Sequence, residues 1–322
     1  MTTFVREIYP VGHGGFAFER IGGYSIVFDC GASSSPARVS QYINHLSLLK
    51  TGPIDRLYIS HFDRDHVNGI SELINKVGVR EVVVPAIPVQ YRVVYDVVTS
   101  GAYSIIRNLL PQGEIRLVEL EGENTIRKDI WEWIAKPMMT SVDWNNLDKE
   151  FCAQNLKINQ LSDPVYVNVV KKIVNRCFKE VFGPQGPNSK GLVLLSQKMG
   201  GDTVCNTLST NNNSHHLKAT AAFYTGDANL KKKNNVSIVE NFVCKHLRWP
   251  LALMQIPHHG SQSNASCCLN KYFPASFYYY QDQSSVRIQK NSVLYQSLMA
   301  NNTLLNVRDV DSDLIHHCVC SR

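Results

Sequence analysis

Hydrophobic and polar residues alternate through the first 32 positions of the chain, which is the pattern of half-buried β-strands. The stretch "FVREIYPVGHGGFAFERIGGYSIVFDCG" predicts two strands joined by a turn at Gly22-Gly23. Helical spacing follows over residues 36–49, with Ser35 as a candidate N-cap. The apolar runs "IDRLYIS" and "REVVVPAI" predict buried strands on either side of a short helix. This order of elements predicts a layered α/β protein.

The pattern changes between about residues 90 and 185, where helical stretches are separated by polar segments rich in Trp and Asn. We interpret this range as a helical insertion in a single domain that spans residues 1–322. Strands are predicted again from residue 188 onward, at "GLVLLSQKM", "ATAAFYTGD", "LALMQIPHHGS", "ASFYYYQ" and "DLIHHCVC". His215 and His216 fall in a polar stretch and are expected in an exposed loop.

Composition and charge narrow the class of protein. Hydrophobic residues make up 44% and charged residues 19% of the chain, the balance of a globular protein and not of a disordered or fibrous one. The net charge of +6 slightly favours a polyanionic partner such as nucleic acid. Since no apolar segment approaches the ~20 residues that cross a bilayer, we expect no membrane partner and a cytoplasmic location. The nine cysteines lack regular spacing, which suits reduced thiols, and Cys318 and Cys320 are expected on an exposed C-terminal strand.

Side chains that can bind metal are concentrated where predicted strands end. The stretch "SHFDRDHVNG" places two histidines and two aspartates within six positions, directly after an apolar run. Further candidates follow three other strands. The full set is His61, Asp63, Asp65, His66, Asp29, Asp227, His258 and His259. Because α/β sheets assemble their sites from loops at one end of the strands, we expect these side chains to converge.

Imidazole and carboxylate ligands together suit Zn, Mn or Fe. A pair of such ions roughly 3.5–4 Å apart can polarise a scissile bond and activate water. We expect His61 and Asp63 to face one metal, Asp65 and His66 to face the other, and Asp227 to bridge them. Taken alone, Asp65 is equally explained as a helix N-cap, and His13 in "VGHGG" as an ordinary turn residue. The density of ligand types favours a site with two divalent metal ions.

These motifs resemble the metallo-β-lactamase-fold hydrolases, whose HxHxDH signature is similar to "SHFDRDH" with Asp63 at the middle histidine. Together with "VGHGG", "FDCG", "YTGDA" and "IPHHGS", the order of motifs is most similar to the hydrolase domain of ComEC-type DNA-uptake proteins. The resemblance covers both ends of the chain and leaves about residues 90–185 and 197–218 as additions.

The resemblance implies an αββα four-layer sandwich of two similar halves, with the metals at the edge between them. It implies a ligand set of His61, Asp63, Asp65, His66, Asp227 and His259, with Asp29 in support and His258 as the alternative to His259. The family's additional histidine before "GLVLLS" is absent, and Asn188 in "GPNSKG" is the candidate for a weak ligand or substrate contact.

The function that follows is a metal-dependent hydrolase that uses a metal-bound hydroxide, with phosphodiester bonds as the leading substrate (a nuclease or phosphodiesterase). Asp65 is expected to accept or relay the proton. An acyl-bond hydrolase, acting on a lactone, thioester or amide, is the alternative from the same chemistry. A non-enzymatic scaffold is the other alternative, in which the insertion, with Trp131, Trp133 and Trp144, binds a protein partner.

Overall fold

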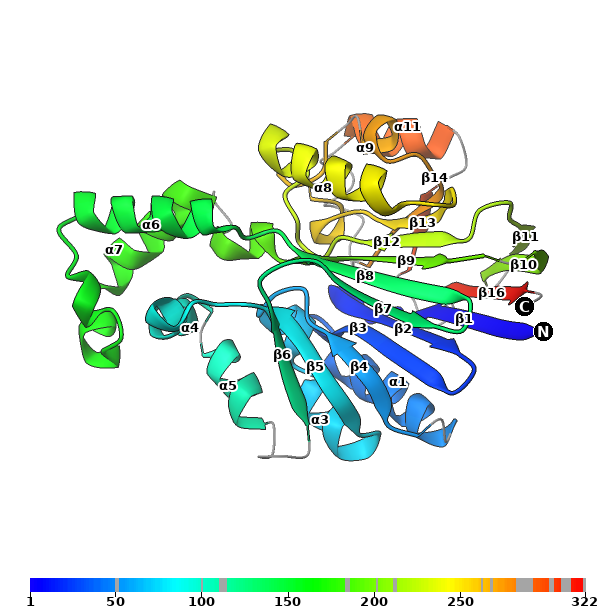
Figure 1. Ribbon diagram of the computed structural model, residues 1–322, viewed down its shortest axis with the longest axis horizontal. Coiled ribbons are helices and arrows are strands. Elements are labelled where there is room, and N and C mark those ends of the chain that lie inside the picture. Colours follow the sequence, from blue (N-terminus) through cyan, green and yellow to red (C-terminus); the bar gives the residue numbers. More distant parts are fainter. Residues whose placement is uncertain are drawn as a thin grey trace.

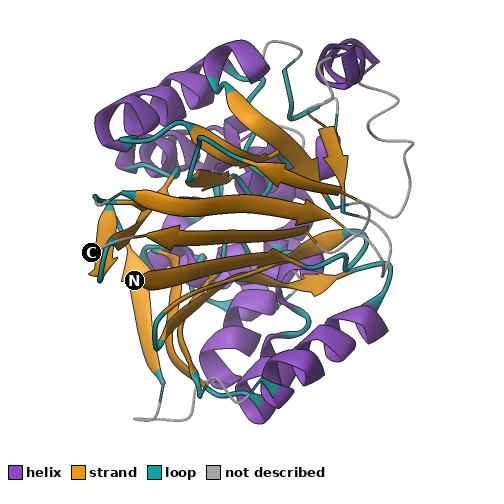
Figure 2. Ribbon diagram, turned by 90° about the vertical axis from the view of Figure 1, so that its right-hand side faces the viewer, coloured by secondary structure: helices purple, strands orange, loops and turns teal. Residues whose placement is uncertain are grey.

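The computed structural model describes residues 1–49, 52–99, 101–109, 115–182, 186–200, 202–210, 213–261, 263–266, 269–281, 292–300, 304–307 and 314–320. Within these ranges the strands form two sheets that face one another, and helices cover the outer face of each (Figures 1 and 2). The fold is the predicted α/β four-layer αββα sandwich. None of the described helices combines the length and the hydropathy needed to cross a bilayer.

The first sheet has nine strands and is antiparallel through β3 and parallel beyond it. Its order is β11 (Asn213–His216), β10 (Thr203–Thr210), β16 (Leu314–Cys320), β1 (Thr2–Ile8), β2 (Gly14–Ile21), β3 (Tyr24–Ala32), β4 (Ile54–Tyr58), β5 (Val79–Pro85) and β6 (Arg116–Leu120). The second sheet has seven strands: β15 (Leu304–Asn306), β14 (Ala275–Tyr280), β13 (Leu251–Gln255), β12 (Ala221–Tyr224), β9 (Leu192–Lys198), β8 (Trp131–Pro137) and β7 (Asn124–Lys128).

The described helices lie on the outside of the two sheets or beyond their edge (Figure 1). They are α1 (Pro36–Leu48), α2 (Arg64–Val67), α3 (Ile70–Lys76), α4 (Arg92–Val98), α5 (Ala102–Leu109), α6 (Ser141–Ala153), α7 (Pro164–Phe182), α8 (Lys233–His246), α9 (Leu269–Tyr272) and α11 (Ser292–Ala300). Short 3₁₀ turns occur at η1 (Val89–Tyr91), η2 (Ile158–Gln160), η3 (Gly186–Lys190) and η4 (His258–Gly260).

Three apolar layers hold the sandwich together. The first sheet packs against α1, α3 and the α4–α7 helices, and the second sheet packs against α8, α9 and α11. The middle layer lies between the sheets, where side chains such as Phe4, Phe28 and Leu194 are fully or almost fully buried. Strands with both faces covered in this way carry apolar residues almost continuously, as β3 and β9 do.

The range 90–185 is helical only at its two ends. Its middle contributes β6 to the first sheet and β7 and β8 to the second. Trp131 and Trp133 of β8 are completely buried and Trp144 of α6 is 8% exposed, so these rings pack inside the protein and present no surface to a partner. Trp131 and Trp133 lie between the sheets because they alternate along β8, whereas Trp144 of α6 stacks on Tyr91 in the layer outside the first sheet.

Two other expectations are corrected at the opposite end of the chain. The strand that carries Cys318 is not exposed, since β16 lies between β10 and β1 and Cys318 is fully buried. His215 and His216 lie in β11, which pairs with β10, and not in a loop. Non-local pairing places β16 inside the sheet, whereas β11 forms a local hairpin with β10 although its polar residues have no strand pattern.

A buried polar network joins the two sheets. Glu19 of β2 accepts hydrogen bonds from Arg6 of β1 (2.6 Å), from Ser196 of β9 (2.6 Å) and from the Trp133 indole of β8. The Arg6 guanidinium also donates to the Tyr224 hydroxyl of β12 at 3.0 Å. Both charged side chains are at most 1% exposed, so each depends on the other for charge compensation.

Replacement of Arg6 by Met is therefore expected to lower the free energy of unfolding by about 3–5 kcal/mol, because it leaves the Glu19 carboxylate buried without its cation. Urea denaturation measures the loss. Arg80→Met is the matched control: its ion pair with Asp55 is as short, at 2.6 Å, but the Arg80 side chain is 64% exposed. We expect the control to lose no more than about 1 kcal/mol. Equal losses in the two variants would contradict a structural role for the buried pair.

Candidate metal centre

Loops from both sheets meet at one edge of the sandwich and bring most of the sequence-predicted ligands together. His61 and Asp63 follow β4, and Asp65 and His66 lie in the short helix α2. The second sheet contributes Asp227 after β12, and His258 and His259 in η4 after β13. His13 comes from the loop between β1 and β2.

One group of three donors is completely enclosed. The His61 Nε2 atom lies 3.5 Å from Asp227 Oδ2, and the His66 Nε2 atom lies 3.4 Å from Asp227 Oδ1. Metal–ligand bonds of about 2.0–2.2 Å in tetrahedral geometry separate ligand atoms by roughly 3.4 Å. The three residues therefore have the spacing of ligands around a shared cation, and they form one of two candidate groups in the described chain.

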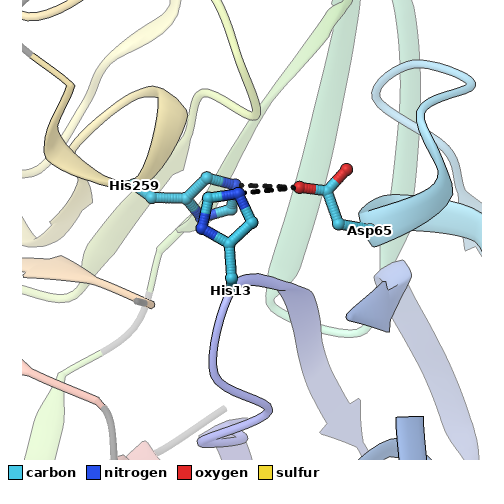
Figure 3. A group of neighbouring side chains, drawn as sticks. All are labelled: His13, Asp65 and His259. Atoms are coloured by element: carbon cyan, nitrogen blue, oxygen red, sulfur yellow. Dashed lines mark ion pairs between the residues drawn. The ribbon is translucent and has the colours of Figure 1, made fainter. Parts of the chain in front are cut away.

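The second group shares a single carboxylate oxygen. The Nε2 atoms of His13 and His259 lie 3.2 and 3.4 Å from Asp65 Oδ2, and both rings point at this oxygen (Figure 3). Asp227 connects the groups, because its Oδ1 atom is also 4.0 Å from His259 Nε2. A carboxylate with histidines of both groups around it can offer one oxygen to each of two metals.

Hydrogen bonds on the far side of each ring fix the histidine tautomers. The Nδ1–H group of His259 donates to the backbone carbonyl of Gln281 at 2.8 Å. His66 Nδ1 is 2.7 Å from Asp29 Oδ2, and His61 Nδ1 is 2.9 Å from the Ser60 hydroxyl, which itself donates to Asp29 at 2.7 Å. In neutral rings this arrangement leaves the Nε2 lone pairs directed into the site, as metal-binding histidines require.

The donors that face the centre have no hydrogen-bond partner among the described residues. These buried atoms are His61 Nε2, His66 Nε2, His259 Nε2 and Asp227 Oδ1. A buried polar atom without a partner costs about 1–3 kcal/mol, so four at one point indicate a ligand that satisfies them together. Imidazole nitrogens with carboxylate oxygens form a donor set that Zn, Mn and Fe accept, and the residues fit a divalent metal.

The electrostatics of both ligand groups favour a positive charge between their side chains. Burial lowers the pKa of His66, but the Asp29 and Asp227 carboxylates outweigh burial and raise it well above its ordinary value. Burial raises the pKa of Asp227, yet His61 and His66 hold it below its ordinary value. The pKa of Asp65 is likewise lowered against burial, by His13 and His259. These carboxylates stay ionised and can stabilise a metal cation.

Local backbone geometry accounts for the positions of several of these groups. Asp29, His258 and His259 adopt positive φ angles of 55°, 50° and 53°, a region that residues other than glycine rarely enter. Such strain is concentrated at functional sites, where the surrounding structure enforces it. Gly226 also has a positive φ of 50°, and a Cβ there would lie 2.7 Å from the Ser60 side chain. Glycine therefore lets the Asp227 turn approach β4 closely.

The grouping of the ligands differs from the sequence-based expectation. His61 and His66 share a group with Asp227, whereas Asp65 lies in the other group with His13 and His259. Asp63 is more peripheral, since its Oδ2 atom is 3.8 Å from His61 Nε2 and its side chain is 41% exposed. His258 Nε2 lies 3.6 Å from Asp227 Oδ2 on the same side as His61. The Asn188 side chain lies outside the described residues.

Two supporting residues were not found from the sequence. Ser60 hydrogen-bonds Asp29 through both its backbone N–H and its hydroxyl, at 2.7 Å each. Its position directly before His61 was the only available signal. The carbonyl of Gln281 orients His259, but a backbone acceptor leaves no mark in the sequence. Asp63 occupies the N-cap of α2 without a side-chain capping hydrogen bond, so capping does not explain the aspartates of this motif.

Comparison with known proteins finds similar solved structures at low sequence identity. No protein-family model and no curated protein matches the chain. Among solved structures, the chain is similar to the metallo-β-lactamase fold protein YhfI from Bacillus subtilis, with a TM-score of 0.49 and 9% identity over 98% of this chain and 100% of that one. Igni18, a metallo hydrolase from Ignicoccus hospitalis, gives 0.46 and 10% over 97% and 98%.

CmlA, a diiron β-hydroxylase from Streptomyces venezuelae, gives a TM-score of 0.47 and 14% identity over 99% of this chain. The chain spans 54% of the length of CmlA. The two facing sheets with outer helices, together with the loops that meet at one edge, form the αββα arrangement that the sequence resemblance implies.

The first test of the centre is its metal content. Protein purified without chelator is expected to carry close to two equivalents of transition metal by mass spectrometry, and Asp227→Ala is expected to lose most of both, because Asp227 has donors of both groups around it. Asp202→Ala, which changes an exposed aspartate outside the centre, is the matched control and should keep the wild-type content. Unchanged metal in Asp227→Ala would rule out a bridging position for this carboxylate.

A second test addresses Asp29, which contacts His66 and Ser60 but belongs to neither group of candidate ligands. Asp29→Asn is expected to weaken metal affinity about 10–100-fold, because the ring of His66 loses its anionic partner. Asparagine is the suitable substitution, since it tolerates the positive φ at this position. Competition against a chelator measures the affinity, and thermal denaturation of the metal-free protein reports whether folding is intact. Wild-type affinity in a folded variant would remove Asp29 from the centre.

Proposed function

We propose that this chain is a metal-dependent hydrolase that cleaves phosphodiester bonds. The observation that carries the proposal is the convergence of three buried imidazole nitrogens and the Asp227 carboxylate, none with another hydrogen-bond partner among the described residues. Two divalent ions in such a centre polarise the bond to be cleaved and lower the pKa of water. His61, His66 and Asp227 would hold one ion, and His13, Asp65 and His259 the other.

The protein's own residues have distinct tasks in this proposal. Asp29 and Ser60 orient the rings of His61 and His66, and the Gln281 carbonyl orients His259. Asp65 would hold one metal ion, and its carboxylate would accept a hydrogen bond from the attacking water. The partly exposed Asp63 lies where the centre opens to solvent, so it can contact both the candidate metal ligand His61 and the incoming substrate.

The choice of a phosphodiester rests on charge and on motif order. The chain has a net charge of +6, and the exposed Arg64 lies between Asp63 and Asp65, where its guanidinium can pair with a phosphate oxygen. The order of motifs resembles the hydrolase domain of ComEC-type proteins, which supports the same substrate class. Within this proposal, Mn and Fe are candidates alongside Zn, because Asp63 replaces the middle histidine of the motif with a harder oxygen ligand.

An acyl ester is the second candidate. Four carboxylates, those of Asp29, Asp63, Asp65 and Asp227, would offset the charge of two divalent cations, which reduces the attraction of the centre for an anionic phosphodiester relative to an uncharged ester. The two candidates can be separated by substrates that share one chromophore.

With Zn or Mn present, the protein is expected to hydrolyse bis(p-nitrophenyl) phosphate, and Asp65→Asn is expected to lower kcat about 100-fold or more. Release of p-nitrophenolate measures both this reaction and that of p-nitrophenyl butyrate. Asp202→Asn is the matched control and should retain full activity. Turnover of the butyrate alone would replace the phosphodiester with the acyl substrate. Wild-type rates in Asp65→Asn and in His66→Ala would exclude this centre as the site of hydrolysis.

A further inference from the structure

A cavity of about 770 Å³ lies beside the candidate metal centre. Asp65, a member of the second ligand group, and the peripheral Asp63 form part of its wall, so the cavity adjoins the centre. Its volume is in the range of small-molecule sites, roughly 300–1,000 Å³. The other described residues that line it are Arg64, Val67, Asn68, Ser71, Val98, Thr99, Ala102, Ile105 and Ile106.

Two helical walls form this cavity, and the wall from α4 and α5 is rich in apolar side chains. Val67, Asn68 and Ser71 come from the α2–α3 segment, while the facing residues come from the end of α4 and from α5. The Asn68 amide bonds both the N–H and the C=O of Ala32, at 2.9 and 2.7 Å, so this wall is fixed in position. Ile105 of α5 is 57% exposed, which leaves apolar surface that a bound group would cover.

The charge on the cavity wall is concentrated at the end next to the metal centre. Asp63, Arg64 and Asp65 are consecutive, and Arg64 is the only basic residue among those described along the wall. Its side chain is exposed and makes no ion pair within the described part of the chain. An arginine in this setting can pair with an anion placed between the metals and the cavity.

We propose that this cavity binds an apolar substituent of a small phosphodiester, with the phosphate held between the metal centre and Arg64. The inference rests on the proposed function and specifies its substrate class. Sites for polymeric nucleic acid use several basic side chains along the backbone and aromatic rings for the bases. The described wall has one arginine and no aromatic ring, whereas five of its residues are aliphatic.

Binding of two phosphonates to the metal-loaded protein tests the cavity without relying on turnover. By calorimetry, phenylphosphonate is expected to bind at least about tenfold more tightly than methylphosphonate, because its phenyl ring is removed from water when it enters the cavity. Ala102→Phe and Ser71→Phe fill the cavity from opposite walls, and each is expected to abolish this difference. Val165→Phe, at a 73% exposed position on α7 outside the cavity, is the matched control and should preserve it.

Arg64 is tested with the same pair of ligands. Arg64→Gln is expected to weaken both phosphonates about tenfold or more and by equal factors, because both carry the anionic group that the guanidinium pairs with. Arg176→Gln changes an exposed arginine of α7 and should leave both affinities unchanged. A loss confined to phenylphosphonate would contradict the assigned position of Arg64.

The outcomes separate this inference from the proposed function. If phenylphosphonate binds selectively, and the filled variants lose that selectivity, the cavity assignment stands even when no phosphodiester is cleaved. If bis(p-nitrophenyl) phosphate is cleaved but the two phosphonates bind equally, the inference is overturned and the phosphodiesterase remains. Preferential cleavage of a single-stranded oligonucleotide, unaffected by Ala102→Phe and Ser71→Phe, would also overturn it.

Discussion

The ion pair between Arg6 and Glu19 is the interaction on which the relative position of the two sheets depends. Apolar packing between sheets is non-directional, and it tolerates small sliding movements. Buried charges with hydrogen bonds to Ser196 and Tyr224 of the opposite sheet tolerate much less, because each displaced partner leaves a desolvated polar atom. The metal centre needs this constraint, since His61 and His66 come from one sheet and Asp227 and His259 from the other.

The candidate site could be predicted from the sequence because its residues follow strands at one edge, and strand ends are visible as apolar runs followed by polar motifs. The grouping of the ligands could not be predicted. Whether Asp65 joins one group or the other depends on the direction of α2 relative to β4 and on the position of η4 in the other half of the protein. The cavity beside the centre could not be predicted from the sequence either. It forms only where α5 packs opposite α3, and neither helix carries a motif that reports the other.

The fold likewise divides into elements with local sequence signals, which could be predicted, and pairings between distant strands, which could not. The turn at Gly22-Gly23 and the helix at residues 36–48 have the predicted form, but the N-terminal stretch forms three strands, β1 to β3, where two were predicted. The long-range pairings could not be predicted, as in the strands at residues 116–137 and in the pairing of β16 with β1 and β10. The polar stretch "NSHH" has no β-signal of its own, and local pairing with β10 supplies its structure. The tryptophans of β8 look like a surface motif until the facing sheet covers them.

The pairing of β16 with β1 and β10 has a consequence for synthesis. Thr2 lies opposite Cys320, so the middle of the nine-stranded sheet joins residues more than three hundred positions apart. A ribosome that has made β1 and its neighbour β2 must still add some three hundred residues before the other neighbour, β16, exists. During this interval β1 has an open edge, and β10 with β11 has no sheet to join. Nascent chains of this protein thus expose pairing-competent strands for most of their translation, and an open strand edge of this kind favours aggregation.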